Sequence, residues 1–243
     1  MKSISYNKLK EMLYNHELWL NCRGGKKINL SYTDLRYVDL RYTDLRYANL
    51  SYTDLSNTNL RYVDLRYTDL RYANLSYTDL RYVDLRYTDL SYTDLSGADL
   101  RHTDLSNADL SYSNLSNADL RCADLSNIKI NYRTLGYHLA CPGEGSFIGY
   151  KKANKHLIKL LILEDSKRSS ATTLKCRCDK AKVLSITNIK TGKEISKIAS
   201  DYDKNFIYEV GKIVEVKDFD EDRWNECSTG IHFFINKESA INY

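Results

Sequence analysis

Cysteine and histidine side chains that could bind a metal ion are concentrated in the second half of the chain. Cys176 and Cys178 are separated by one residue, and the other candidate ligands are Cys141, Cys227, His138 and His232. Thiolate and imidazole are groups that zinc prefers. Structural zinc sites, however, use cysteine pairs with two residues between them, and that spacing does not occur here. We therefore expect neither a metal site nor a bound cofactor.

A second cluster, between residues 168 and 175, combines basic and hydroxyl side chains. It consists of Arg168, Ser169, Ser170, Thr172 and Lys175. Such groups can bind a phosphate or a sulfate. The same composition is also typical of an exposed loop, and the sequence leaves both interpretations open. The candidate pocket of this part of the chain is formed by Arg168, Ser169, Ser170, Cys227 and His232.

The segment GIHFF, at residues 230–234, is followed by Lys237, Ser239, Ala240 and Tyr243. This pattern is similar to a segment of ADP-ribosyltransferases in which an aromatic residue stacks on nicotinamide, and His232 stands at the position of that residue. The resemblance implies a nucleotide-binding C-terminal domain. That family places its catalytic glutamate on a strand after this segment, whereas this sequence ends at Tyr243. Transfer chemistry is therefore not expected, and nucleotide binding is kept as an alternative.

No further arrangement of catalytic residues stands out in the sequence. We find no Ser/His/Asp order, no phosphate-binding glycine loop and no pair of carboxylates in apolar surroundings. These observations favour a non-enzymatic protein.

Composition describes a globular protein without a membrane segment. The chain has 243 residues, of which 42% are hydrophobic, and a mean hydropathy of −0.53. No stretch approaches 18 consecutive apolar residues, and the N-terminus lacks the apolar run of a signal peptide. We expect a cytoplasmic protein with reduced cysteines and no membrane partner. A net charge of +4 is too small to indicate nucleic-acid binding by itself.

A repeat of five residues dominates the first half of the chain. Every fifth residue is leucine from Leu30 to Leu125, and Ile130 and Leu135 continue the series to 22 registers. A period of five fits neither an amphipathic helix nor an alternating strand. The chain must therefore turn at regular intervals and stack on itself, as solenoid proteins do.

The residue before each leucine is almost always aspartate or asparagine, and the residue before that is small or β-branched, usually threonine, valine or alanine. The pattern resembles that of the pentapeptide-repeat family and extends over residues 26–135. The resemblance implies a mainly β protein, built on a right-handed four-sided β-helix of about 5.5 coils. Four pentapeptides would form one 20-residue coil, with the leucine and the small residue pointing inward.

Folding the sequence at 20 residues aligns charged side chains on two adjacent faces. The resulting candidate interaction face contains Arg41, Arg61, Arg81, Arg101 and Arg121 in one column and Arg46, Arg66 and Arg86 in the next. Each arginine follows an outward aspartate or asparagine by two residues, so much of the repulsion is offset locally. A solvated wall of alternating charge is the simpler interpretation, and a binding stripe is the alternative.

The same folding aligns six tyrosines on another face. This aromatic column consists of Tyr32, Tyr52, Tyr72, Tyr92, Tyr112 and Tyr132. Stacked rings could stiffen the corners of the β-helix, or they could form a platform for aromatic recognition.

Some pentapeptide-repeat proteins modulate DNA gyrase by imitating the acidic surface of duplex DNA. Residues 31–135 contain 15 Asp against 12 Arg and Lys, a balance of 12 − 15 = −3. This weak negative charge makes a modulator of gyrase or another topoisomerase an alternative rather than the leading hypothesis. Direct nucleic-acid binding is not favoured, because the interleaved aspartates would repel phosphates.

The N-terminal segment, residues 1–25, is predicted to be a capping helix. Leu9, Met12, Leu13, His16, Trp19 and Leu20 recur at helical spacing and form one apolar stripe. Ser5 can cap the start, and Gly24 with Gly25 can end the segment. We interpret His16 as a core or capping histidine.

Residues 136–243 have a different composition and form the predicted C-terminal domain, a small β-rich α+β unit. Strands are predicted at residues 156–163, 181–187, 206–216 and 230–235, with a terminal helix after Asn236. The segments at 141–152, 165–178 and 224–234 resemble an uncharacterised domain that follows pentapeptide repeats in bacterial and phage proteins. That resemblance implies no activity.

These observations lead to one hypothesis about function. The protein is expected to be a non-enzymatic interaction scaffold or rigid spacer, whose C-terminal domain or β-helix faces bind a protein partner of unknown identity. A monomer is slightly favoured, because a domain occupies the end that gyrase-directed relatives use for dimerisation.

Overall fold

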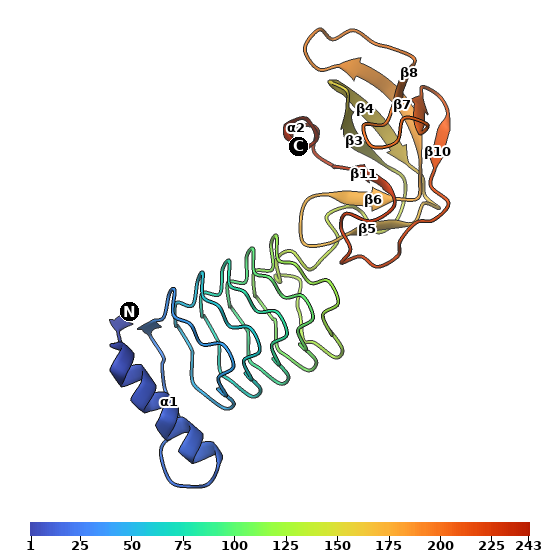
Figure 1. Ribbon diagram of the computed structural model, residues 1–243. Coiled ribbons are helices and arrows are strands. Elements are labelled where there is room, and N and C mark those ends of the chain that lie inside the picture. The colour runs from blue at the N-terminus through green and yellow to red at the C-terminus, as the bar shows by residue number, and fades with distance from the viewer. The chain divides into compact units, whose positions relative to one another are not determined.

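The computed structural model describes residues 1–243 and divides into two compact units, Met1–His138 and Leu139–Tyr243. The first contains the helix α1 (Tyr6–Leu20) and the β-helix; the second, the C-terminal domain, ends with the helix α2 (Lys237–Asn242) (Figure 1). Neither helix has the length and apolar character that crossing a membrane requires.

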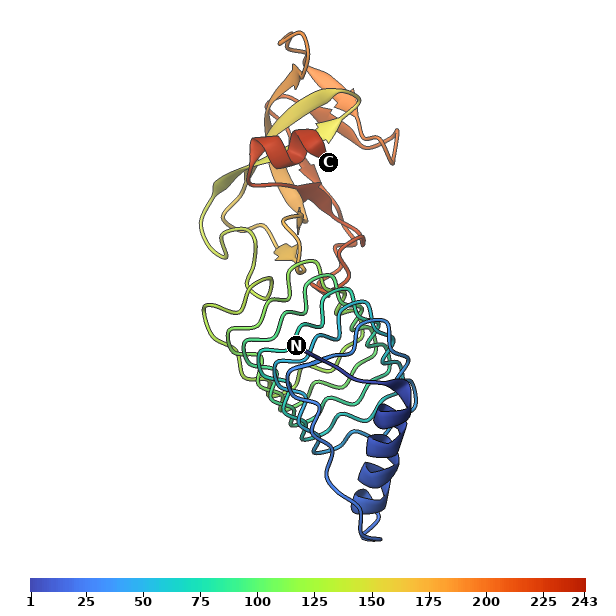
Figure 2. The same cartoon turned by 90° about the vertical axis from the view of Figure 1, so that its left-hand side faces the viewer.

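The β-helix is held together by parallel bridges between residues 20 apart. They run without interruption from Asn29↔Asn49 to Asp109↔Lys129, and each coil stacks directly on the one before it (Figure 2). The Leu35 N–H donates to the Asp54 carbonyl at 2.8 Å, and the Asp54 N–H donates to the Thr33 carbonyl at 3.1 Å. The predicted class, a mainly β protein built on a four-sided β-helix with an N-terminal helix, is confirmed.

The interior contains the two residue types that the repeat predicts. Leu60, Leu80 and Leu100 are at most 1% exposed. Threonines that point inward donate to backbone carbonyls. The Thr58 hydroxyl donates to Leu35 of the neighbouring coil at 3.1 Å, and the Thr103 hydroxyl donates to Leu100 of its own coil at 2.6 Å. The core therefore buries hydroxyls without leaving them unpaired.

Each corner of the β-helix is a tight turn with a left-handed residue. The Thr33 N–H donates to the Leu30 carbonyl, which closes a four-residue turn, and Tyr32 in its third position has a φ of 59°. Glycine or asparagine usually fills that position, because a left-handed conformation costs other residues roughly 1–2 kcal/mol. Tyrosine occupies it at most corners of this protein.

The predicted register is wrong at the last coil. Leu135 bridges Asn114, an offset of 21 rather than 20, and its side chain is 57% exposed. Thr134 occupies the inward position instead, where its hydroxyl donates to the Leu110 carbonyl at 3.0 Å. The last coil contains one extra residue after Ile130. The leucine spacing alone therefore overestimates how far the regular 20-residue coil extends along the chain.

The N-terminal segment covers the first coil in two ways. The strand β1 (Lys2–Ser3) pairs in parallel with β2 (Thr33–Asp34), as a preceding coil would. In α1, the Ser5 side chain accepts from the Lys8 N–H, as predicted, and Leu9 and His16 are buried. The chain then passes so close to the helix that a side chain at Gly25, whose φ is 76°, would collide with the Asn15 carbonyl.

The C-terminal domain contains two main antiparallel sheets and a separate two-stranded ribbon. The first sheet has the order β10-β7-β4-β3, the second β11-β6-β5, and the ribbon pairs β8 with β9. The bounds are β3 (Phe147–Ala153), β4 (His156–Ile162), β5 (Arg168–Ser170), β6 (Cys176–Cys178), β7 (Lys180–Asn188), β8 (Lys197–Ala199), β9 (Ile207–Glu209), β10 (Ile213–Glu215) and β11 (Ile231–Phe233).

Three of the predicted strands correspond to β4, β7 and β11, and the terminal helix begins at the Asn236 cap as expected. The segment 206–216 is two strands rather than one, because Gly211, with a φ of 88°, separates β9 from β10. The two main sheets meet where Tyr150 and Phe234 exchange backbone hydrogen bonds of 2.8 Å. Phe233 packs directly over Gly149, where a side chain would collide with its ring.

Candidate functional site

The arginines of the β-helix are engaged by the aspartates of their own pentapeptides. The Arg81 Nε and Nη2 donate to the two oxygens of Asp79 at 2.8 and 2.6 Å, and the Nε lies 3.3 Å from Asp99 of the next coil. The same two-residue pairing joins Arg36–Asp34, Arg41–Asp39, Arg46–Asp44, Arg66–Asp64, Arg71–Asp69, Arg86–Asp84, Arg101–Asp99 and Arg121–Asp119.

The aspartates have a second role that the sequence did not reveal. The Asp34 Oδ1 also accepts the Arg36 N–H, at 3.1 Å, and so stabilises the turn. These hydrogen bonds lower the pKa of Asp34 and of Asp39 to about 2. The arginine columns are therefore a wall of closed ion pairs rather than a row of open cations.

Arg61 is the exception in its column. Residue 59 is asparagine rather than aspartate, so Arg61 makes no ion pair, and its Nε is buried without a hydrogen-bond partner. Its guanidinium instead lies 5.3 Å from the ring centre of Tyr62. The exception shows that the arginine pairing depends on the residue two positions earlier.

The aromatic column contains five stacked rings, not six. Successive rings from Tyr32 to Tyr112 lie 4.5–4.7 Å apart and are nearly parallel. Tyr132 leaves the column because of the extra residue in the last coil, and Arg133 lies over Tyr112 at 6.0 Å instead. Because each ring covers the next, the column presents edges and hydroxyls, which suit a stiffening role better than a stacking platform.

Two further stacks were not identified from the sequence. Tyr42, Tyr62, Tyr82 and His102 form one, and Tyr47, Tyr67 and Tyr87 form the other, which Trp19 of α1 meets edge-on. Trp19 in turn stacks on His16, whose Nδ1 accepts the Ile28 N–H at 3.2 Å. His16 is thus a capping histidine, as expected, and the 20-residue period already contained the signal for the other stacks.

In the C-terminal domain, the Arg168 cluster does not form an open pocket. The Arg168 guanidinium lies over Phe147 and donates to five backbone carbonyls, those of Pro142, Gly145, Leu163, Glu164 and Ser166. Ser169 and Ser170 are buried, and the Ser170 hydroxyl accepts the Ala140 N–H at 2.8 Å. Arg168 and Ser170 therefore hold loops in place, and Cys227 and His232 are the candidate pocket residues that border the large cavity of this domain.

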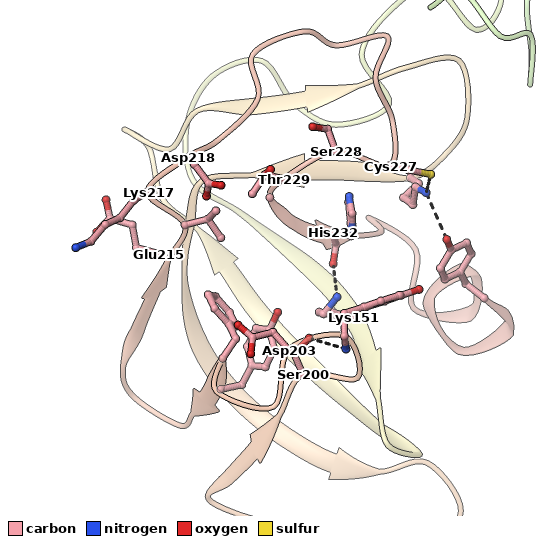
Figure 3. A pocket seen from close by; sticks show the side chains of 17 residues that line it. Lys151, Ser200, Asp203, Glu215, Lys217, Asp218, Cys227, Ser228, Thr229 and His232 are labelled. Atoms are coloured by element: carbon pink, nitrogen blue, oxygen red, sulfur yellow. Dashed lines mark hydrogen bonds between the residues drawn. The ribbon is translucent and has the colours of Figure 1, made fainter.

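That cavity, shown in Figure 3, has a volume of about 770 Å³. Lys151 and His232 lie in its centre, Asp203 and Ser200 on one side, and Cys227 on the other. Further lining comes from Lys175, Phe206, Tyr208, Val216, Thr229 and Tyr243. Lys151 was missed from the sequence, because only the pairing of β3 beside the end of β11 brings it to His232.

Lys175 is the neutralised cation of this cavity. It is 6% exposed, lies 3.5 Å from Glu226, and donates to the Tyr243 hydroxyl at 3.3 Å. Burial opposes its charge, but the attraction of Glu226 and the Tyr243 hydrogen bond outweigh burial, and the pKa of Lys175 is raised.

The candidate metal ligands are not brought together. No group of three or more His, Cys, Asp or Glu side chains in residues 1–243 has an arrangement that could hold a metal ion. Cys141, Cys176 and Cys178 are buried, and contact between the first two lowers the pKa of Cys141 and raises that of Cys176. Cys227, by contrast, is exposed at the cavity.

Two different family models match the two structural units of the chain. The model for pentapeptide repeats matches residues 27–61, 64–101 and 98–131, and that for a family of unknown function (DUF5758) matches residues 137–240. No curated protein matches the chain.

Several solved structures are similar to part of the chain. A pentapeptide-repeat protein of the cyanobacterium Cyanothece is 24% identical, with 51% of this chain and 97% of that chain covered and a TM-score of 0.40. A pentapeptide-repeat protein of the Arabidopsis thaliana thylakoid lumen is 24% identical, with coverage of 42% and 71% and a TM-score of 0.41. The plasmid-mediated fluoroquinolone resistance protein QnrB1 is 20% identical, with coverage of 43% and 57% and a TM-score of 0.31.

Proposed function

Because the chain is a pentapeptide-repeat protein that continues into a DUF5758 domain, we propose that it is a non-enzymatic scaffold. In this proposal the β-helix is a rigid spacer, and the C-terminal domain makes the contact with a protein partner in the cytoplasm.

The closed ion pairs on the β-helix are the observation that carries this proposal. Each paired guanidinium binds an aspartate of the same corner through its Nε and Nη2, and seven of them also lie near the aspartate of the next coil. A partner that docked on this wall would have to break pairs that already satisfy one another. The stacked tyrosines similarly use their faces on one another, which supports stiffness rather than recognition.

The C-terminal domain differs in having exposed apolar side chains on short elements. Ile207, Val210 and Ile213 are 42%, 39% and 57% exposed and lie within seven residues around the turn between β9 and β10. Exposed apolar groups of this kind are what protein interfaces bury. They support the assignment of partner contact to this domain.

Site-specific photo-crosslinking of the full chain tests the proposal. A benzophenone side chain replaces either Tyr77 of the β-helix or Tyr202 of the C-terminal domain, which are 70% and 86% exposed. We expect a crosslinked protein from position 202 and none from position 77. Crosslinking from position 77 alone would contradict the spacer role.

Deletion of one coil provides the matched control. Removing residues 61–80, a copy of residues 36–55, takes out 20 residues and keeps every remaining side chain on its face. A spacer should retain the crosslink from position 202 after this deletion. With purified DNA gyrase, the scaffold predicts unchanged supercoiling, whereas a DNA mimic would alter it.

A further inference from the structure

The charged side chains of the C-terminal cavity lie at different depths: the acidic side chains and Lys217 are exposed, and the other cationic and imidazole groups lie deeper (Figure 3). Asp203, Glu215 and Asp218 are exposed, whereas Lys151 and His232 are partly buried and Lys175 is buried. The acidic groups are therefore solvated at the edge, and the interior of the cavity is lined by nitrogen groups. A volume of about 770 Å³ lies in the range of roughly 300–1,000 Å³ that small-molecule sites occupy.

Lys151 lacks an anionic partner in this interior. Its ammonium group has three donors, and its hydrogen bond is a long one of 3.4 Å to the His232 carbonyl. No carboxylate lies within ion-pair distance of it, although Lys175 is paired with Glu226. Burial lowers the pKa of Lys151, the nearby positive charge of Lys175 adds to this effect, and Asp201 opposes it.

His232 is the second unsatisfied group. Its Nε2 is buried and has no hydrogen-bond partner in the protein. Burial, followed by the charges of Lys151, Lys175 and Arg177, lowers the pKa of His232 to about 4. The imidazole is therefore neutral at physiological pH and lies beside a cation whose charge is not compensated.

The remaining wall of the cavity is apolar and aromatic. Phe206 and Tyr208 meet edge to face with ring centres 5.3 Å apart, and Val216 lies on the same lining. Tyr208 is 2% exposed and so holds its ring in a fixed position. Such a wall suits a flat apolar body.

We propose that this cavity binds a small organic anion, with one carboxylate or phosphate group at Lys151 and a planar apolar body against Phe206, whose ring the buried Tyr208 supports. The anion supplies the partner that the Lys151 ammonium lacks. A single anionic group fits better than a polyphosphate, because the other deep cation, Lys175, is already paired with Glu226.

Titration of the full chain, labelled at histidine for NMR, tests this site. The probes are phenyl phosphate and benzoate, with phenol as the uncharged counterpart of the same shape. We expect the His232 ring signal to move with one or both anions and not with phenol. His156, on β4 of the same domain but outside the cavity, is the internal control. The anion that binds more tightly identifies the head group.

Removing the charge of Lys151 provides the second measurement. Lys151→Met should weaken binding of the better anion about tenfold or more, the usual loss for a charge-assisted hydrogen bond. Lys182→Met, an exposed lysine on β7 away from the cavity, should bind like the wild type. Absence of wild-type binding to both anions at millimolar concentration would overturn the proposal. Equal binding of phenol, or undiminished binding by a folded Lys151→Met protein, would also overturn it.

Discussion

In the β-helix an arginine binds the aspartate two residues before it, whereas in the C-terminal domain the buried arginines bind backbone carbonyls far along the chain. Arg101 pairs with Asp99 on the surface. Arg177 is 1% exposed and donates to the carbonyls of Asp220, Asp222 and Thr229, at 2.8–3.0 Å. Repetition thus satisfies polar groups locally, and the irregular domain satisfies them through tertiary contacts.

The two regions therefore differ in what they leave unsatisfied. In the β-helix most corners share one pattern of contacts, and the Nε of Arg61 lacks a partner because residue 59 is asparagine. In the C-terminal domain a cavity contains Lys151, which has no anionic partner, and His232, whose Nε2 has no hydrogen-bond partner. This difference supports the proposal that the β-helix is a rigid spacer and that the C-terminal domain makes the contact with a partner.

The strongest test of the comparison is a charge in the core of the β-helix. Leu80→Lys buries an ammonium group where Leu80 is fully buried, and it should destabilise the β-helix by about 4 kcal/mol or more. Calorimetry should show loss of the β-helix transition. Ser76→Lys, at a corner position where Arg36 stands in the same column, should melt normally. Unchanged melting of Leu80→Lys would contradict the assigned register.

Arginine removal should affect the two regions unequally. Arg177→Met leaves three carbonyls without their donor and should cost about 3 kcal/mol of the stability of the C-terminal domain. Arg101→Ser breaks a partly exposed surface pair and should cost no more than about 1 kcal/mol. Urea denaturation of both variants measures the difference, and equal costs would refute the contrast.

The stability of each unit should depend on pH through one histidine whose pKa is lowered by burial. The folded-state pKa of His232 is about 4, below its ordinary value of 6.5, and burial also lowers the pKa of His16. Between pH 6.5 and 4 the unfolded chain therefore binds more protons, so stability falls as the pH is lowered through this window. His232→Gln should flatten that loss in the C-terminal domain alone, as measured by melting temperature against pH.

The aspartates of the β-helix should become protonated, and their contribution to stability should be lost, at a lower pH than the histidines. Arginine and backbone hydrogen bonds hold the pKa of Asp34 and Asp39 at about 2, so their contribution is present above the ordinary pKa of about 4 and is lost as the pH falls toward 2. A melting-temperature series from pH 4 to 2 should show this loss in the β-helix. A flat profile there would mean that the pairs contribute nothing.

The smallest expected effect is an increase in the stability of the β-helix. Asn59→Asp supplies the carboxylate that Arg61 lacks and should raise the stability of the β-helix by up to about 1 kcal/mol. Asn74→Asp is the matched control, because Ser76 rather than arginine follows it. If both variants behave alike, the pairing of arginine with the preceding aspartate is not the cause.

Much of the β-helix could be predicted from the sequence because its contacts repeat every 20 residues. The inward leucines, the arginine columns and the capping role of His16 all follow from spacing. The exposure of Leu135 and the displacement of Tyr132 cannot be predicted from spacing. Leucine still recurs at the fifth position in the sequence, but the last coil contains one extra residue, which shifts the backbone relative to the coil before it.

The left-handed tyrosines also escaped prediction. Glycine and asparagine are the residues that usually indicate such turns, and at most of the tyrosine corners, where φ is near 60°, the ring stacks on those of adjacent coils and offsets part of the cost. That compensation exists only once the coils are formed.

The C-terminal cavity shows where sequence information ends. Sequence patterns predicted several strands and the Asn236 cap, and they identified Cys227 and His232 as candidate pocket residues. Tertiary structure alone decided that Arg168 would hold loops together and that Lys151 would face the same cavity as His232. Lys151 and His232 are 81 residues apart and meet through strand pairing. A repeat carries its contacts in its period, whereas an irregular domain brings distant residues together only when its chain has folded.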